Sequence, residues 1–360
     1  MTQRAHAAPM AEADALAPRL GDWCAQRLPQ RGAVAVRRLR ASAGGFSNVT
    51  LLGELVSSEG GVEGEQGIVV RIAGGGDGVF PKGDLRRQVD CLQRLAGSAV
   101  PVPELIGFES DVSWLGAPFY VMARVEGQVP NENPLYHLEG WLHDLDPAQR
   151  RCHWLAGIDT IAAVARIDWR ARGFADLLPP AGRPPLAHQL ERCLAHLRWS
   201  EGLGRPYPLL HDAYRWLHAH QPDDEPVALQ WGDAKLGNCV YRDGAVVAAL
   251  DWEEPALGSP VDDLAWWLTL DDSMSTGYGV PRLAGLPTRE ETVAHWERAS
   301  GHSARHLDYY EVFTAWRFAI VMTRIGTIFT QRGLVPPQAE MDLRNGGAVL
   351  LRQLADRHGF

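Results

Sequence analysis

The chain has 360 residues, 46% of them hydrophobic and 22% charged, and its formal net charge is −9. At roughly 150 residues per domain, this length predicts about two domains or one large bilobal unit. The composition excludes a disordered or collagen-like chain. The acidic balance argues against binding to the phosphate backbone of nucleic acids.

The first 125 residues have the pattern of an antiparallel sheet with one inserted helix. An opening helix is expected over residues 10–28, and Leu85, Val89, Leu92 and Leu95 form the apolar stripe of a second helix. The stretch 57–66, rich in Gly, Ser and Glu, suits a hairpin turn. Strands are expected over residues 34–39, 49–56, 68–72, 104–108 and 118–125. The glycine run that follows the third strand opens no helix, so we interpret it as a connection.

From residue 126 onward the pattern is mainly helical. Helices are expected over residues 147–167, 186–197, 209–220, 261–270, 290–299, 307–329 and 337–357. A strand-rich island interrupts them, with strands at 227–230, 238–241 and 245–250 and a tight turn at Arg242-Asp243-Gly244. The sequence therefore predicts two domains, residues 1–125 and residues 126–360.

The cysteines and the apolar segments indicate a cytoplasmic protein. None of the five cysteines forms a C-x-x-C pair or a zinc or disulfide spacing, so reduced thiols are expected. No run of 18 apolar residues is present, which predicts no membrane span, and residues 1–20 lack the apolar core of a signal peptide. We expect neither a nucleic-acid nor a membrane partner, and the sequence leaves the oligomeric state open.

The strand-rich island carries the residue types that phosphoryl transfer from ATP requires. Such transfer needs a carboxylate that orients the attacking hydroxyl, a cation near the moving phosphoryl group and oxygen ligands for Mg²⁺. Asp233 and Asn238 are five residues apart, and Asp251 follows thirteen residues later, after a strand, a turn and a strand. Lys235 is placed to touch the transferred phosphate.

These stretches resemble the aminoglycoside phosphotransferase family of small-molecule kinases, whose fold is that of protein kinases. The family motifs H-G-D-x-x-x-x-N, L-D-W-E and G-D-P-x-x-D-L-A correspond to Trp231–Asn238, Leu250–Glu253 and Gly258–Ala265. Ser42–Asn48 resembles the loop over the nucleotide phosphates, and Pro118–Gly127 resembles the interlobe hinge. The chain is similar to a bacterial subgroup that also resembles the kinase-like domains fused to some acyl-CoA dehydrogenases.

The resemblance implies an α+β, protein-kinase-like bilobal fold. Residues 1–125 would form the nucleotide-binding lobe and residues 126–360 the helical catalytic and substrate-binding lobe. The cofactors would be ATP and Mg²⁺. Asp233 would be the catalytic base, Lys235 would contact the phosphate, and Asn238 and Asp251 would hold the metal.

The resemblance also assigns nucleotide-binding residues in the first lobe. Backbone amides of the glycine-rich loop would cover the phosphates, Arg71 would face the α- and β-phosphates, and Gln88 would stand where the family has a Glu that pairs with that basic residue. Ala123 and Val125 would meet adenine through backbone groups. The residues of the glycine-rich loop are Gly44, Gly45, Phe46, Ser47 and Asn48.

The chain departs from the family pattern at four positions. Arg71 stands in place of Lys, keeps the positive charge and can bind phosphate in a bidentate manner. Trp231 replaces the His two residues before Asp233, where we expect an indole to pack. Gln88 replaces Glu and would pair with Arg71 only by a hydrogen bond. Ser259 replaces the Asp of G-D-P, which we interpret as structural. We expect Asp263 to brace the catalytic loop rather than to touch substrate.

Several other polar and aromatic residues are expected to serve the structure. The histidines at 137, 143 and 153 are expected to be satisfied or exposed, and most tryptophans of the second lobe to be core, with a few available for an apolar pocket. Asp262, Asp271 and Asp272 are expected at a solvated helix end.

The leading hypothesis is an ATP-dependent phosphotransferase acting on a hydroxyl of a small molecule such as an aminoglycoside. Two alternatives stay open at this point. One is a kinase of a hydroxyacyl-CoA or another apolar alcohol, which the tryptophan-rich lobe fits. The other is a nucleotide-binding protein without catalysis, which Gln88 and Trp231 motivate.

Overall fold

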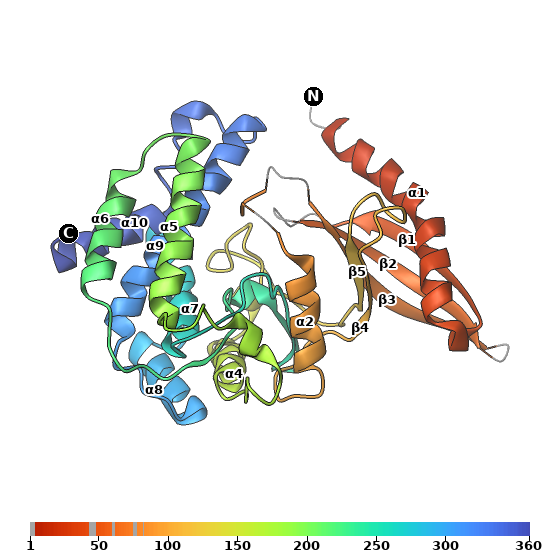
Figure 1. The fold of residues 1–360 in the computed structure, drawn as a ribbon, viewed down its shortest axis with the longest axis horizontal. Coiled ribbons are helices and arrows are strands. Elements are labelled where there is room, and N and C mark those ends of the chain that lie inside the picture. The colour runs from red at the N-terminus through yellow and green to blue at the C-terminus, as the bar shows by residue number, and fades with distance from the viewer. Residues whose placement is uncertain (1–3, 43–47, 60–61, 75–77, 82) are drawn as a thin grey trace. The chain divides into compact units, whose positions relative to one another are not determined.

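The computed structural model describes residues 4–42, 48–59, 62–74, 78–81 and 83–360. The chain divides into two compact units (Figure 1), a sheet unit of Met1–Ala96 with Val102–Glu126 and a helical unit of Gly97–Pro101 with Gly127–Phe360. Four predicted phosphate-loop residues, Gly44, Gly45, Phe46 and Ser47, lie outside the described residues.

The sheet unit is built on five antiparallel strands in the order β1-β2-β3-β5-β4. Its elements are α1 (Arg4–Arg27), a 3₁₀ turn (Pro29–Arg31), β1 (Ala33–Ala41), β2 (Asn48–Glu59), β3 (Val62–Ala73), α2 (Leu85–Leu95), β4 (Leu105–Glu109) and β5 (Phe119–Ala123). The predicted strands and both helices are confirmed. The hairpin turn expected over 57–66 is confirmed but is shorter than predicted, because β2 and β3 stay paired in antiparallel register out to Glu59 and Val62, and β2 also pairs with β1 there.

The two faces of this sheet have different neighbours. Trp23 of α1 packs in one apolar cluster with Val70, Ile72 and Phe119. Side chains alternate between the faces of a strand, so Arg71, between Val70 and Ile72, points away from this cluster. The sheet therefore keeps a core face under α1 and presents Arg71 on the opposite face.

The helical unit contains most of the remaining secondary structure. Its helices are α3 (Trp141–Asp144), α4 (Pro147–Ala165), α5 (Pro185–Gly202), α6 (Pro208–Ala219), α7 (Val261–Met274), α8 (Arg289–Ser300), α9 (Leu307–Gln331) and α10 (Gly346–His358). Its strands are β6 (Ala228–Gln230), β7 (Cys239–Arg242), β8 (Ala245–Ala249) and β9 (Ala256–Gly258). Four 3₁₀ turns complete it, at Phe174–Leu177, Leu236–Asn238, Thr276–Tyr278 and Pro337–Ala339.

Local sequence signals explain several of these boundaries. Asp146 opens α4 and Thr288 opens α8, each through a capping box that satisfies amides of the first turn. The predicted turn between β7 and β8 is confirmed, with Asp243 and Gly244 both at positive φ as a two-residue hairpin requires. The helix predicted over 337–357 is wrong in its first part, because Asn345 caps a helix that begins only at Gly346.

Helix α9 is the core helix of its unit. Four other helices, α5, α6, α7 and α10, pack against it (Figure 1). Among the described helices, α9 alone has the length and mean hydropathy, 1.3 over its most apolar window, that a membrane span needs, and 67% of that window is buried within the unit. The core helix of a globular unit also meets these criteria of length and mean hydropathy, so burial within the unit explains why α9 is so apolar.

Candidate active site

The loop that carries Asp233 follows β6, and the side chain of Asp263 binds its backbone. The backbone N–H groups of Trp231 and Gly232 donate to the two carboxylate oxygens of Asp263, at 2.7 and 2.9 Å. Gly232 has φ +89°, and a Cβ there would collide with the carbonyl of Glu254. The expectation that Asp263 braces this loop is confirmed by these two hydrogen bonds.

Asp263 is fully buried in the first turn of α7. Burial and the neighbouring charge of Asp262 raise the pKa of the Asp263 carboxyl to about 7, while the two backbone N–H groups oppose that rise. Asp262 is also buried rather than solvated, and its carboxylate accepts from Arg317 at 3.2 Å. The prediction of a solvated helix end was therefore wrong for Asp262.

The Asp233 carboxylate is fixed at both of its oxygens. Its Oδ2 accepts from Nδ2 of Asn238 at 2.7 Å, and its Oδ1 accepts from the indole Nε1–H of Trp266 at 2.9 Å. Each carboxylate oxygen has two lone pairs, so both retain a site for a further donor such as an acceptor hydroxyl. The carboxylate is 29% exposed and can be reached from solvent.

Trp266 is itself held by Arg317 of α9. The guanidinium lies over the indole at 4.0 Å from the ring centroid, and it also donates to the carbonyl oxygen of Gly232 at 3.2 Å. Arg317 therefore joins α9 to α7 and to the loop of Asp233.

The two predicted metal ligands are linked through the backbone. Nδ2 of Asn238 donates to the carbonyl and the carboxylate of Asp233, so the amide oxygen Oδ1 is left for another partner. The N–H of Leu250 donates to the carbonyl of Asn238 at 2.8 Å, which ties the residue before Asp251 to the same loop. Asp251 has φ +61°, a strained conformation that is typical of functional positions.

The donors at these two positions fit Mg²⁺. This ion takes oxygen ligands and commonly binds through one or two carboxylates, several waters and substrate phosphates. An amide oxygen and a carboxylate satisfy that pattern. In the described part of the chain no group of three or more His, Cys, Asp or Glu side chains could hold a metal alone, so phosphate and water oxygens would have to complete the shell.

Trp231 fills the position where the family motif has His. Its indole is fully buried, stacks on Trp252 with ring centroids 5.6 Å apart and donates Nε1–H to the carbonyl of Leu250 at 2.8 Å. The tryptophan therefore packs as expected, and it also links the loop of Asp233 to the segment that leads into Asp251.

Lys235 has a partner that the sequence did not indicate. Its ammonium lies 2.9 Å from Oε1 of Glu132 and 3.7 Å from Oδ2 of Asp233. Glu132 precedes Lys235 by about a hundred residues and belongs to no motif, so only the folded chain reveals it.

The residues predicted to bind nucleotide in the sheet unit have identifiable settings. Arg71 on β3 pairs with Tyr120 on β5, so both side chains occupy the same sheet face. The Tyr120 hydroxyl donates to Oε1 of the buried Gln88 at 2.9 Å. Asn48 is buried at the start of β2. Gln88, the predicted partner of Arg71, therefore contacts Tyr120, the residue that lies next to Arg71 on the adjacent strand.

The two predicted hinge residues differ in their backbone bonding. The N–H of Ala123 donates to the carbonyl of Glu104 at 2.8 Å, so the sheet already uses this amide. For a contact from a backbone amide to adenine, the prediction therefore rests on Val125.

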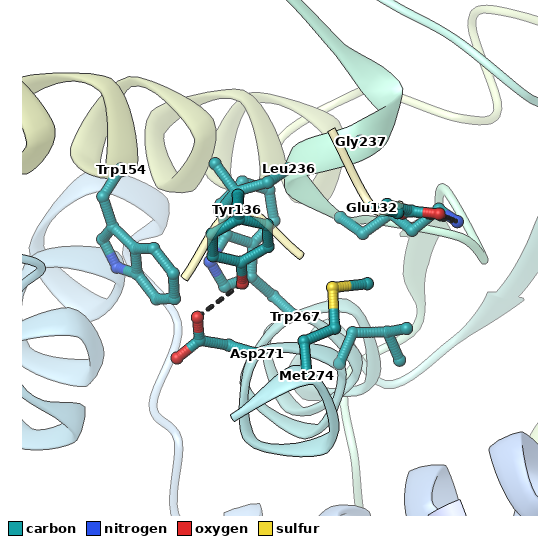
Figure 2. Close-up of a pocket in the computed structure, with 10 residues that line it drawn as sticks. Glu132, Tyr136, Trp154, Leu236, Gly237, Trp267, Asp271 and Met274 are labelled. Carbon is teal, nitrogen blue, oxygen red and sulfur yellow. Dashed lines mark hydrogen bonds and ion pairs between the residues drawn. The ribbon is translucent and has the colours of Figure 1, made fainter. Parts of the chain in front are cut away.

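A small pocket adjoins the catalytic loop within the helical unit (Figure 2). Its volume is about 10 Å³, room for about one water molecule. Its lining includes the indoles of Trp154 and Trp267 together with Leu236, Leu270 and Met274. Core packing was the expectation for most tryptophans, and these two are buried and also line the pocket.

A buried polar network closes one side of this pocket. Asp271 accepts from the Tyr136 hydroxyl at 2.6 Å (Figure 2) and from Nε of Arg282 at 2.6 Å. His137 is buried beside it and accepts from the N–H of Leu283 at 3.1 Å, as expected for a satisfied histidine. The prediction that Asp271 is solvated was wrong, because it is 3% exposed and paired with Arg282.

The model of the phosphotransferase enzyme family matches residues 43–302, which include the loop of Asp233 and the segment of Asp251. The chain belongs to the phosphotransferase enzyme family.

Solved structures show the same fold in other phosphotransferases. A protein from Ralstonia eutropha JMP134, described as a candidate aminoglycoside phosphotransferase, superposes with a TM-score of 0.71 at 22% identity and covers 94% of this chain and 98% of its own. The GDP complex of a mutant aminoglycoside 2′-phosphotransferase-IIIa gives a TM-score of 0.57 at 13% identity, over 93% and 96%. The predicted protein-kinase-like α+β fold is confirmed.

The chain is also similar to part of a larger protein. Acyl-CoA dehydrogenase family member 11 of Gallus gallus is 29% identical over 246 residues, which are 65% of this chain and 30% of that protein. The chain therefore spans under a third of the length of this relative. The expected similarity to acyl-CoA dehydrogenase family proteins is confirmed.

Proposed function

We propose that the protein transfers the γ-phosphoryl group of ATP to a hydroxyl group of a small molecule. The observation that carries this proposal is the Asp233 carboxylate, which is fixed by Asn238 and Trp266 and still has lone pairs for an acceptor hydroxyl. Such a fixed carboxylate suits the orientation of an attacking oxygen, where positioning supplies most of the rate enhancement.

The transfer would be a single in-line displacement. The acceptor oxygen bonds to the γ-phosphorus as the bond between that phosphorus and the β–γ bridging oxygen breaks, which leaves ADP. Asp233 accepts the hydroxyl proton. Lys235, a cation beside Asp233, would neutralise charge on the transferred group.

Asn238 and Asp251 would hold Mg²⁺, which supplies charge neutralisation at the phosphates. The hydrogen bond between Leu250 and Asn238 supports this assignment, because it brings the two ligand segments together. Backbone groups near Val125 and the side chain of Arg71 would bind the nucleotide.

An apolar alcohol is a second candidate for the acceptor. The pocket beside Lys235 and Gly237 has room for only about one water molecule and cannot hold an alkyl or aryl group, so this candidate rests on the similarity to acyl-CoA dehydrogenase family member 11. A relative named for acyl-CoA dehydrogenase adds a hydroxyacyl-CoA to the candidates.

The test is transfer of labelled γ-phosphate in the presence of Mg²⁺. The acceptor panel contains aminoglycosides, polyols, aliphatic alcohols and hydroxyacyl-CoA esters, with ATP and GTP compared as donors. The wild type should phosphorylate at least one acceptor, and Asp233→Asn should abolish transfer while nucleotide affinity stays close to that of the wild type. Turnover retained in Asp233→Asn would refute the role of Asp233. Nucleotide binding without transfer to any acceptor would favour the non-catalytic alternative.

A further inference from the structure

The Lys235 ammonium lies between two carboxylates of the helical unit. Glu132 provides the nearer one, with Nζ to Oε1 at 2.9 Å and Nζ to Oε2 at 3.2 Å, and Asp233 provides the other at 3.7 Å. The Lys235 side chain is only 20% exposed, so these anions dominate its surroundings. The ammonium is thus held slightly away from Asp233 by a stronger contact to Glu132.

The segment that carries Glu132 is fixed to the strand that follows the catalytic loop. Gln128 and Tyr241 of β7 exchange two backbone hydrogen bonds, at 2.8 and 2.7 Å. The indole of Trp141 donates to the carbonyl of Val129 at 2.9 Å, so the far end of the segment is bonded back to its beginning. The position of Glu132 is therefore set by the fold and not by Lys235 alone.

Gly237 makes room for the Glu132 carboxylate. A Cβ at position 237 would lie 2.9 Å from the carboxyl carbon of Glu132 and closer still to Oε1, and Figure 2 shows Glu132 beside Gly237. The atoms that such a Cβ would meet belong to the end of a flexible side chain. An alanine there would therefore displace the carboxylate of Glu132 and leave the backbone in place.

Lysine is rare in this chain. Among its 35 basic residues only Lys82 and Lys235 are lysines. An ammonium is a compact charge on a flexible stem and can turn from one anion to another, whereas a guanidinium favours a fixed, bidentate pairing. The chemistry at position 235 thus fits a cation that changes partners.

We propose that Glu132 is a positioning residue that holds the Lys235 ammonium away from Asp233 until the γ-phosphate becomes its partner. This inference rests on the proposed phosphoryl transfer. Without the Glu132 charge, Lys235 would settle on Asp233 and occupy the oxygen that the acceptor hydroxyl needs. The loss would fall on kcat more than on the KM for ATP.

The charge state of Lys235 offers a readout that needs no turnover. Burial lowers the pKa of this ammonium, but the charges of Asp233, Glu132 and Asp251 outweigh burial and raise it. Only the neutral amine reacts with acylating reagents. Removal of the Glu132 charge should therefore make Lys235 more reactive, and each unit of lowered pKa corresponds to a change of about tenfold.

The experiment measures the acylation rate of Lys235 by peptide mass spectrometry, with Lys82 as the internal reference. Glu132→Gln and Gly237→Ala should each raise the reactivity of Lys235 about tenfold and leave Lys82 unchanged. Glu139→Gln, an exposed glutamate on the same segment, is the matched control and should change neither lysine.

Kinetics then test the catalytic consequence. Glu132→Gln should lower kcat about tenfold with a nearly unchanged KM for ATP, and it should add no further loss in a Lys235→Met background. Unchanged labelling of Lys235 in Glu132→Gln would overturn the proposal whether or not the enzyme is active. Increased labelling with an unchanged kcat would overturn it as well. A wild type that transfers no phosphate would instead refute the proposed function. The labelling result would still test whether Glu132 controls the reactivity of Lys235.

Discussion

The indole N–H of Trp266 donates a hydrogen bond to Oδ1 of Asp233, with 2.9 Å between nitrogen and oxygen. Trp266 lies on α7, three residues after the Asp263 that holds the same loop through its backbone. Helix α7 therefore fixes both the backbone and the side chain of the proposed catalytic segment. The orientation of Asp233 depends on a helix that lies outside the motif.

Replacement of Trp266 by Phe tests this relationship. The variant removes the N–H donor and keeps most of the aromatic surface. A hydrogen bond to a charged group contributes about 1.5–3 kcal/mol, so we expect kcat to fall about tenfold to a hundredfold with nucleotide affinity nearly unchanged. Steady-state kinetics and calorimetric nucleotide binding provide the two measurements.

The control is Trp296→Phe. Trp296 is also buried, and its Nε1 has no hydrogen-bond partner within the described residues. This variant should leave kcat near the wild-type value. An equal loss in both variants would mean that Trp266 acts through packing and not through Asp233.

Trp231→Phe should destabilise the protein. The variant leaves the carbonyl of the half-buried Leu250 without the indole donor, and the loss of a typical intramolecular hydrogen bond costs about 0.5–1.5 kcal/mol. Trp231→His, which restores the residue typical of the family, should cost more, because a smaller and more polar ring would leave a gap beside Trp252. Urea unfolding measures both. Equal or higher stability of Trp231→His would contradict this account.

Asp251→Asn should separate metal binding from nucleotide binding. In the wild type, ATP with Mg²⁺ should raise Tm, and a chelator should remove most of that rise. In Asp251→Asn the Mg²⁺-dependent part should be lost, because the amide keeps the shape but lacks the charge that attracts the ion. Differential scanning fluorimetry at several Mg²⁺ concentrations measures this.

The matched control for that experiment is Asp243→Asn. Asp243 is an exposed aspartate at the turn of the β7–β8 hairpin, which precedes Asp251, and it also has a positive φ, 53°. Its variant should respond to Mg²⁺ as the wild type does. A Mg²⁺ response retained in Asp251→Asn would remove Asp251 from the metal site.

The elements and the chemistry at Asp233 could be predicted because their signals are local. The spacing from Asp233 to Asn238 and the turn at Asp243 and Gly244 are local in sequence, and periodicity or turn chemistry determines such features. The strands of the sheet unit followed from the same rules.

The supporting contacts could not be predicted because they join distant segments. Glu132 meets Lys235 across about a hundred residues, and Arg317 reaches Trp266 from another helix. No periodicity encodes which of many carboxylates or cations will be the partner. The burial of Asp262 and Asp271 was missed for the same reason, since each depends on an arginine elsewhere, Arg317 and Arg282.

The raised pKa of Asp263 predicts a pH-dependent stability. Its folded value of about 7 lies above the ordinary 3.8 because of burial and the charge of Asp262. The stabilising contribution of this group is therefore fully present below pH 3.8 and is lost as pH rises through about 7.

The Asp263→Asn variant has no carboxyl group at this position to titrate. It also keeps only one acceptor for the two N–H groups of Trp231 and Gly232. The wild type should be more stable than the variant at pH near 5, and this advantage should shrink as pH rises through about 7. Urea unfolding across this range, with Asp243→Asn as the control, measures the difference. Parallel stability curves for the wild type and Asp263→Asn would show that the Asp263 carboxyl is already ionised in the folded protein throughout the range.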